Sequence, residues 1–289
     1  PILDGGRLAE LDAVVDRARE AARAFRRLDQ EQVDTVVHAM VVAGLKAAIE
    51  LAGLAIEETG FGVFEDKVVK NYVATEFLND YLRGKRSVGV IEEDLAQGIE
   101  RVAEPVGVVL AITPITNPTS TVLFKAIVAA KTRNAIIFRP SPYATRCAVR
   151  TVEILREAAE GAGMPAGALQ IVPDSEHEAT HHFFRHPGID LIWTTGGQKI
   201  VAYSQAAGKP CITVGPGNAP VYLHHTADVR CAAVDILISK TFDSSLICPA
   251  EQTCVIDEAI HDAVIAEFER LGARLLTTAQ GDKLATFAF

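Results

Sequence analysis

Five cysteines are the best nucleophiles that this sequence offers, because a thiolate can attack a carbonyl carbon and hold the acyl group as a thioester. They are Cys147, Cys211, Cys231, Cys248 and Cys254. Their number is odd and no two form a CxxC pair, so the sequence favours neither a disulfide framework nor a structural zinc site. Residue type alone does not select one of them, since a free cysteine is often simply part of a core.

A second pattern with chemical meaning is His177-Glu178-Ala179-Thr180-His181, which matches the zinc-peptidase signature HExxH. Two histidines four residues apart on a helix could bind one zinc ion, with Glu178 activating a water molecule. The helix must end before Pro187, no GxxH extension follows, and His182 and His186 make the whole stretch rich in histidine. Surface histidines are therefore the better interpretation, and a zinc peptidase is kept as an alternative.

Three loops rich in Pro, Gly, Thr and Ser are candidates for holding a ligand that carries phosphate. They are Thr113–Ser120, Arg139–Pro142 and Thr194–Gly197. Each follows an expected strand and opens an expected helix, whose first N–H groups and positive dipole end attract anions. No GxGxxG fingerprint occurs, and Pro and Gly also punctuate ordinary turns, so both interpretations stay open.

The elements that must position these loops alternate between strand and helix. The first 80 residues are predicted to be helical from apolar spacing at 11–25 and 33–58, and 87–104 is typical of an extended hairpin. Strands are expected at 106–113, 135–139, 169–172, 190–195 and 210–214, with helices at 119–131 and 144–162. Strands that alternate with helices need both faces covered, so the predicted fold class is α/β with a doubly wound parallel sheet.

Composition narrows the classes of function. The 289 residues are 49% hydrophobic and 22% charged, as in a globular chain with a sizeable core. The net charge of −9 repels phosphate backbones and argues against nucleic acid as a partner. Residues 105–124 carry no charge, but their three prolines argue against a membrane span. No signal peptide is visible and the cysteine usage suits a reducing compartment, so we expect a cytoplasmic protein.

Several segments together resemble the aldehyde dehydrogenase superfamily, and its CoA-acylating branch in particular. They are Glu104–Ser120, Lys131–Phe138, Val214–Pro220 and Ser239–Gln252. The likeness extends to the aldehyde dehydrogenase half of bifunctional aldehyde–alcohol dehydrogenases and to free-standing acylating enzymes, and it covers essentially the whole chain. It implies a dinucleotide-binding domain at 1–220, with N-terminal helices and an oligomerisation hairpin at 87–104, and an incomplete second α/β catalytic domain at 221–289.

For catalysis, the resemblance implies that Cys248 is the nucleophile. Asn117 would be the side-chain donor that, with the Cys248 backbone N–H, holds the tetrahedral oxyanion. Val214 stands where hydrolytic members of the superfamily carry a Glu that activates water, and a valine cannot act as a base. The thioester would then persist until CoA takes the acyl group, giving aldehyde + CoA + NAD(P)⁺ ⇌ acyl-CoA + NAD(P)H. Cys254, in the strand after Cys248, is expected in the core.

The resemblance also implies a set of residues around the dinucleotide. They are Thr113, Pro114, Arg139, Ser141, Pro142, Thr195, Gly196, Gly197 and Gly215. Many members of the superfamily hold the adenine ribose with a Glu near the strand at 135–139, and this chain has none there. Arg139 could meet a 2′-phosphate, so NADP stays possible, although NAD is favoured.

The resemblance implies that the catalytic domain continues well beyond residue 289, so the chain is expected to be truncated. A catalytically impaired nucleotide-binding fragment is therefore the main alternative to an active enzyme. The aldehyde stays open among acetaldehyde, sulfoacetaldehyde and a semialdehyde. A homo-oligomer formed through the hairpin is expected.

Overall fold

The computed structural model describes residues 3–173 and 176–288 and divides the chain into two compact units. Unit 1 is Pro1–Pro216 and unit 2 is Gly217–Phe289. The division falls between residues 216 and 217, close to the boundary of 220/221 that the sequence suggested. Each unit has its own hydrophobic cluster.

Unit 1 begins with helices, as predicted. These are α1 (Gly5–Phe25), α2 (Gln30–Lys46), α3 (Ala48–Thr59), α4 (Phe64–Tyr72), the π-helical turn η1 (Val73–Phe77) and α5 (Leu78–Leu82). The single periodic stretch expected at 33–58 is in fact α2 and α3, which are bent by 60° around Ala47. Within the described residues no single helix is long and apolar enough to cross a membrane, and this bent pair alone meets the length and composition criterion.

The centre of unit 1 is a five-stranded sheet in the order β5-β4-β3-β6-β7, and all neighbouring strands are parallel. Its strands are β3 (Val108–Ile112), β4 (Ala135–Arg139), β5 (Leu169–Ile171), β6 (Leu191–Thr195) and β7 (Cys211–Val214). Every residue of β3 and β4 is buried, as expected for central strands covered on both faces. The prediction of a doubly wound parallel sheet is confirmed.

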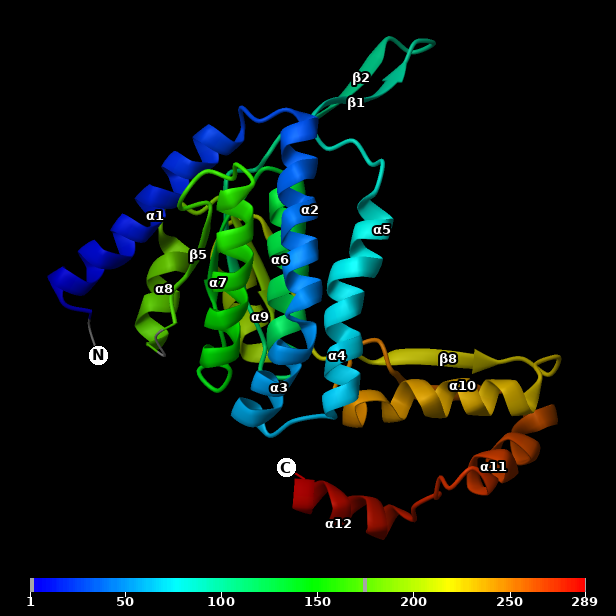
Figure 1. Cartoon of the computed structure of the whole chain (residues 1–289). Coiled ribbons are helices and arrows are strands. Elements are labelled where there is room, and N and C mark those ends of the chain that lie inside the picture. The colour runs from blue at the N-terminus through cyan, green and yellow to red at the C-terminus, as the bar shows by residue number, and fades with distance from the viewer. Residues whose placement is uncertain (1–2, 174–175, 289) are drawn as a thin grey trace. The chain divides into compact units, whose positions relative to one another are not determined.

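Helices cover both faces of this sheet (Figure 1). Right-handed crossovers put α6 (Pro118–Lys131) and α7 (Thr145–Gly161) on one face, where α2 packs over both. The return of the chain toward β6 and β7 puts α8 (His177–Arg185) and α9 (Gln198–Gln205) on the other face, which α1 shares. The loops at the carboxyl ends of the strands are thereby fixed by two packed layers.

Gly107 explains why the chain can enter β3 between two neighbours. Its φ is +124°, and a Cβ there would overlap the carboxylate of Asp190. Asp190 Oδ2 accepts a hydrogen bond from the Val108 N–H at 2.8 Å, and Asn134 Oδ1 accepts one from the Gly107 N–H at 3.0 Å. Side chains that precede β4 and β6 therefore set the position of β3 between them.

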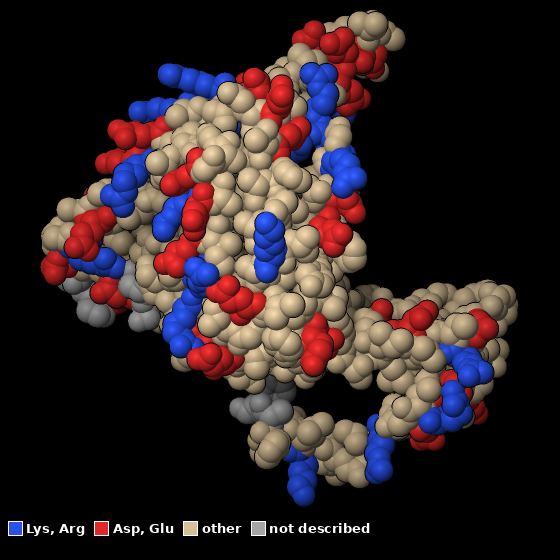
Figure 2. Space-filling model, in the orientation of Figure 1, with Lys and Arg blue, Asp and Glu red and all other residues tan. Residues whose placement is uncertain are grey.

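An antiparallel hairpin, β1 (Gly89–Asp94) with β2 (Ile99–Ala103), falls within the predicted 87–104. A register shift between Val90 and Glu92 interrupts the pairing. Most of its side chains are exposed, and acidic ones gather on it in Figure 2. The hairpin thus adds little to the core of unit 1.

In the residues of unit 2 that the structure describes there are two strands, which pair in parallel: β8 (Ala219–Leu223) and β9 (Glu251–Ile256). Its other elements are α10 (Val229–Thr241), two 3₁₀ turns η2 (Phe242–Ser245) and η3 (Glu258–Ile260), α11 (His261–Arg270) and α12 (Thr278–Ala288). The prediction that Cys254 lies in the core is wrong: it is in β9 but exposed. A two-stranded sheet offers little surface against which side chains can pack, and most residues of β9 are exposed.

Candidate active site

The sheet order places two predicted loops at the point where the connectivity of the sheet reverses. From β3 the chain moves outward through β4 to β5, then returns to place β6 on the other side of β3. Open α/β sheets bind ligands in the crevice beyond the carboxyl ends of such strands. The loops after β3 and β6 flank this position, and the loop after β4 adjoins it, because Ser141 N–H donates to Thr113 O at 3.1 Å.

Thr113 is the residue at this position whose polar group most needs a ligand. It is 2% exposed, and its Oγ1 makes no hydrogen bond to any residue in the described ranges. A buried hydroxyl without a partner costs free energy, so such an atom in a native structure calls for an explanation. A polar group of a bound ligand would satisfy it, which fits the predicted cofactor role of Thr113; Pro114, the next residue, is half-buried.

The loop after β6 offers backbone donors. Gly197 is the N-cap of α9, and no side chain caps this helix end. Gly196 N–H donates to Val214 O at 3.1 Å, which ties the loop to the end of β7, just before Gly215. Thr195 is half-buried at the end of β6. The first turn of α9 therefore presents backbone N–H groups of the kind that bind phosphate.

Arg139 is used inside the protein. It is 4% exposed, and its guanidinium donates to Val172 O, Glu176 O and Thr180 Oγ1 at 3.1, 2.8 and 3.0 Å. These bonds connect the end of β4 with the start of α8. They give no support to the idea that Arg139 meets a 2′-phosphate. Pro142, in contrast, is exposed.

Three buried lysines surround the loop after β3, and the sequence interpretation missed all of them. Lys67 Nζ donates to Thr116 O at 2.6 Å. Lys70 Nζ donates to the candidate oxyanion residue, Asn117, at Oδ1 and 2.6 Å. Lys125 donates to main-chain carbonyls of β3 and β6, and burial lowers its pKa to about 7. A signal was present: Lys125 interrupts a run of apolar residues that periodicity places in the core.

The candidate nucleophile, Cys248, lies in unit 2 after a strained turn. Asp243, Ser244 and Ser245 are three consecutive non-glycine residues with φ of 50°, 54° and 67°. This left-handed region is costly for such residues, and strain of this kind clusters at functional sites. Cys248 is half-buried, and a Cβ at Gly217 would overlap its carbonyl oxygen, so only glycine allows the two backbones to meet here.

Three of the other cysteines are held away from the thiolate form. Burial, followed by the neighbouring Glu58, raises the pKa of Cys147 far above its usual range. The negative charge of Asp228 raises the pKa of Cys231, and partial desolvation, followed by the charge of Glu251, raises that of the otherwise exposed Cys254. A raised pKa disfavours the nucleophile, since the thiolate is the reactive species.

The HExxH residues do not converge. The ring of His181 packs edge-on against Tyr203, with centroids 5.0 Å apart, and against Phe184. Within the described residues, neither His177 nor His181 belongs to a group of three possible metal ligands. The geometry therefore gives the zinc-peptidase alternative no support.

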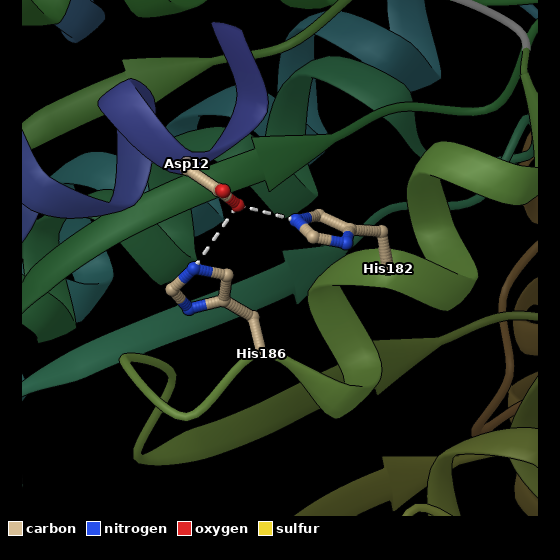
Figure 3. A group of neighbouring side chains, drawn as sticks. All are labelled: Asp12, His182 and His186. Atoms are coloured by element: carbon tan, nitrogen blue, oxygen red, sulfur yellow. Dashed lines mark hydrogen bonds and ion pairs between the residues drawn. The ribbon is translucent and has the colours of Figure 1, made fainter. Parts of the chain in front are cut away.

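The neighbouring histidines instead meet an aspartate from α1 (Figure 3). Nε2 of His182 and of His186 lie 2.7 and 3.3 Å from Asp12 Oδ1. Nδ1 of His186 accepts a hydrogen bond from the Gly188 N–H at 3.0 Å, so the neutral ring carries its proton on Nε2, toward Asp12. A metal ion at Nε2 would have to displace that proton, and the group is better explained as a contact that fastens α8 to α1.

Comparisons with known proteins agree with one another. A model described as aldehyde dehydrogenase family matches residues 4–286. Aldehyde-alcohol dehydrogenase 2 of Entamoeba histolytica is 40% identical over 96% of this chain and 32% of its own length. Sulfoacetaldehyde dehydrogenase (acylating) of Cupriavidus necator is 38% identical over 94% of this chain and 55% of its own.

The fold is shared as well. The crystal structure of an acetylating aldehyde dehydrogenase from Geobacillus thermoglucosidasius matches with a TM-score of 0.91 and 39% identity, covering 98% of this chain and 62% of that one. The chain thus spans less than two thirds of each of these three proteins.

Proposed function

The chain belongs to the aldehyde dehydrogenase family, and from that premise we propose that it catalyses aldehyde + CoA + NAD(P)⁺ ⇌ acyl-CoA + NAD(P)H. The observation that carries the proposal is the setting of Cys248: the residue is half-buried, follows a left-handed turn, and its backbone packs against Gly217. The resemblance expected from the sequence is confirmed. The names of two relatives include the words acylating and acetylating, which agrees with CoA as acyl acceptor.

In the first step the Cys248 thiolate forms a bond to the aldehyde carbon, and the carbonyl oxygen takes the negative charge. The Asn117 amide and the Cys248 backbone N–H would donate to this oxyanion, and donors aimed at a developing negative charge lower the barrier. The bound dinucleotide supplies the acceptor for the hydride that leaves the same carbon. Thr113 and the first turn of α9 would hold that dinucleotide.

The second step transfers the acyl group. Val214 ends β7 and carries no group that can take a proton from water, so hydrolysis of the thioester has no base at that position. The CoA thiolate would attack the thioester carbonyl and form a tetrahedral adduct. Collapse of this adduct would break the bond to Cys248 and release it as a thiolate. The same steps run in reverse reduce an acyl-CoA to an aldehyde.

For the cofactor we favour NAD over NADP. The side chain of Arg139, which the sequence offered for a 2′-phosphate, is buried and bonded to three internal acceptors. The aldehyde is taken to be small, with acetaldehyde first, and sulfoacetaldehyde or a semialdehyde next. All five cysteines are free, which fits the reducing cytoplasm.

Self-association through the hairpin β1–β2 is a further part of the proposal. The hairpin exposes apolar side chains, including Leu95 and Ile99, and contributes little to its own unit. We expect light scattering at micromolar concentration to give at least a dimer, and deletion of 89–103 to give a monomer. A monomeric parent chain would contradict this part alone.

The decisive test is NAD(P)H formation from acetaldehyde, with and without CoA, by the parent chain and by Cys248→Ala. We expect reduction that requires CoA and disappears in Cys248→Ala, with Cys231→Ala, an exposed cysteine on α10, as the matched control. A chain that binds NAD by calorimetry but forms no NADH would favour the alternative of a nucleotide-binding fragment. Reduction that persists in Cys248→Ala would exclude Cys248 as the nucleophile.

A further inference from the structure

Lys70 is a buried cation to which the proposed mechanism gives no task. It lies on α4, is 6% exposed, and places Nζ 2.6 Å from Asn117 Oδ1. Burial of an ammonium group is costly unless its partners are well arranged. Lys67, one turn earlier, holds the preceding carbonyl, Thr116 O, also at 2.6 Å. Helix α4 therefore grips the loop after β3 at two successive residues.

The position of α4 is itself fixed from both sides. Asn71, next to Lys70, is fully buried; its Nδ2 donates to Ala48 O and its Oδ1 accepts from Thr119 Oγ1, both at 2.9 Å. These bonds tie α4 to α3 and to the first turn of α6. The ammonium of Lys70 is thus presented to Asn117 by a rigid support.

The donor chemistry of lysine determines which way the Asn117 amide points. An ammonium group has three donors and no acceptor, so only the amide oxygen can face it. The amide nitrogen is then on the opposite side, where one of its two N–H groups donates to Thr116 Oγ1 at 3.1 Å. Rotating the amide by half a turn would put its NH₂ against the ammonium. The second N–H keeps a fixed direction for that reason.

The amide oxygen has given up its usual local role to make this bond. Asn117 is the N-cap of α6, a position where an asparagine side chain commonly accepts from the N–H two or three residues on. Among the described residues there is no such capping bond at Asn117. Its oxygen is bonded to a charged donor instead, and a charge-assisted bond polarises the amide and strengthens its N–H as a donor.

We propose that Lys70 is a positioning residue for the reaction: it orients and polarises Asn117 so that the second N–H of the amide meets the oxyanion. The inference rests on the proposed function, since it assumes that Asn117 is the oxyanion donor. It adds a residue that acts only through Asn117. That dependence is what an experiment can measure.

The experiment is a double-mutant cycle on the parent chain with Lys70→Met and Asn117→Ala. Removal of one oxyanion donor costs about 100-fold in kcat, and we expect Lys70→Met to lose on the order of 30-fold with KM for the aldehyde little changed. In the Asn117→Ala background, Lys70→Met should cost no more than about threefold, because the residue it positions is gone. Lys70→Arg, which keeps charge and donors, should restore most of kcat.

Lys131→Met is the matched control, because Lys131 is equally buried but pairs with Asp34 at the far end of α6. It should leave kcat within about twofold of the parent. Equal, additive losses from Lys70→Met with and without Asn117 would overturn the positioning role and leave the proposed function standing. A rise in KM with kcat unchanged would also overturn the positioning role.

The four chains of the cycle, which are the parent, Lys70→Met, Asn117→Ala and the double variant, are also unfolded in urea. This measurement tests the contact between the two residues even if the parent chain has no turnover. Non-additive midpoints for Lys70→Met and Asn117→Ala support the orienting contact, and additive midpoints overturn it. Absence of turnover in the parent, with NAD binding intact, counts against the proposed function through its own test.

Discussion

Unit 1 and unit 2 are stabilised in different ways, although both carry candidate site residues. Unit 1 buries a continuous cluster on both faces of a five-stranded sheet, from α1 through β6. In the described part of unit 2 the buried apolar cluster is Leu223, Ile236 and Val264, beside a pair of strands, and Ala233 and Ala250 are buried outside it. Two-stranded sheets are marginal on their own, so we expect unit 1, for which we propose nucleotide binding, to be the more stable unit and unit 2, which carries Cys248, the less stable one.

Three of the four non-glycine residues with positive φ in the described ranges lie in unit 2, and the fourth, Arg133, lies in unit 1. Asp243, Ser244 and Ser245 are left-handed, and such conformations cost on the order of 1 kcal/mol or more each. The backbone strain next to Cys248 must therefore be offset by the burial of a small hydrophobic core. We expect unit 2 to open first.

The largest effect is expected from a matched pair of core truncations, one in each unit. Leu110→Ala, in β3, should cost about 3–4 kcal/mol, and Leu223→Ala, in β8, about 2–3 kcal/mol. We expect Leu223→Ala nevertheless to unfold its unit at lower urea, because its reserve is smaller. Hydrogen exchange resolved by unit would measure this, and a single cooperative transition in both variants would contradict it.

Gly217→Ala should separate chemistry from stability. A Cβ at Gly217 overlaps the Cys248 carbonyl, so the thiol must move, and a shift of about 1 Å can cost on the order of 100-fold in turnover. NAD binding by unit 1 should be unchanged. Gly281→Ala, with open space around it in α12, is the control, and equal activities would show that the loop adapts.

The free energy of unfolding of unit 1 should depend on pH through the titration of Lys125. Burial lowers its pKa to about 7, so the unfolded chain binds more protons than the folded one between that pH and 10.5. Stability should therefore rise, by about 1.5 kcal/mol from pH 7 to 8.5. Urea unfolding at the two pH values measures it, and Lys125→Met should remove the rise. An equal rise in Lys125→Met would assign it to other groups.

The smallest expected effect is a gain. Ser245→Gly places at φ +67° the residue that adopts this conformation freely, and should stabilise unit 2 by about 0.5–1 kcal/mol. Thermal unfolding measures the gain. Ser239→Gly, inside α10, should destabilise by a similar amount and thus separates relief of strain from a general effect of glycine.

Local patterns were enough to predict the framework of unit 1. The strand at 135–139 is β4 to the residue, and the loops expected to bind ligand do follow β3, β4 and β6. Such predictions succeed because buried parallel strands are short apolar runs bounded by Pro and Gly, which are local properties. The choice of Cys248 needed the flanking resemblance, and nothing local singled it out.

Contacts between distant residues could not be predicted in this way. Asp12 meets His182 across 170 positions, and Lys70 meets Asn117 across 47. The sequence suggested that Arg139 could contact a cofactor 2′-phosphate. Its partners lie in a loop and in helix α8, and apolar periodicity does not predict that these segments lie close to the end of β4. Cys254 was expected in the core because a strand was expected to be covered, and the number of layers is a tertiary property.

The π-helical turn η1 has a consequence for where the side chains of its helical run can point. Helices α4 and α5 form one run interrupted by Val73–Phe77, where the i→i+5 pattern adds a residue to the turn. One added residue rotates everything after it by about 100°, so the two halves of the run present different faces to their surroundings. Leu78 can face the core while Lys70 faces the loop. One continuous helical run can therefore place its α5 half against the core and still direct Lys70, in its α4 half, at the loop after β3.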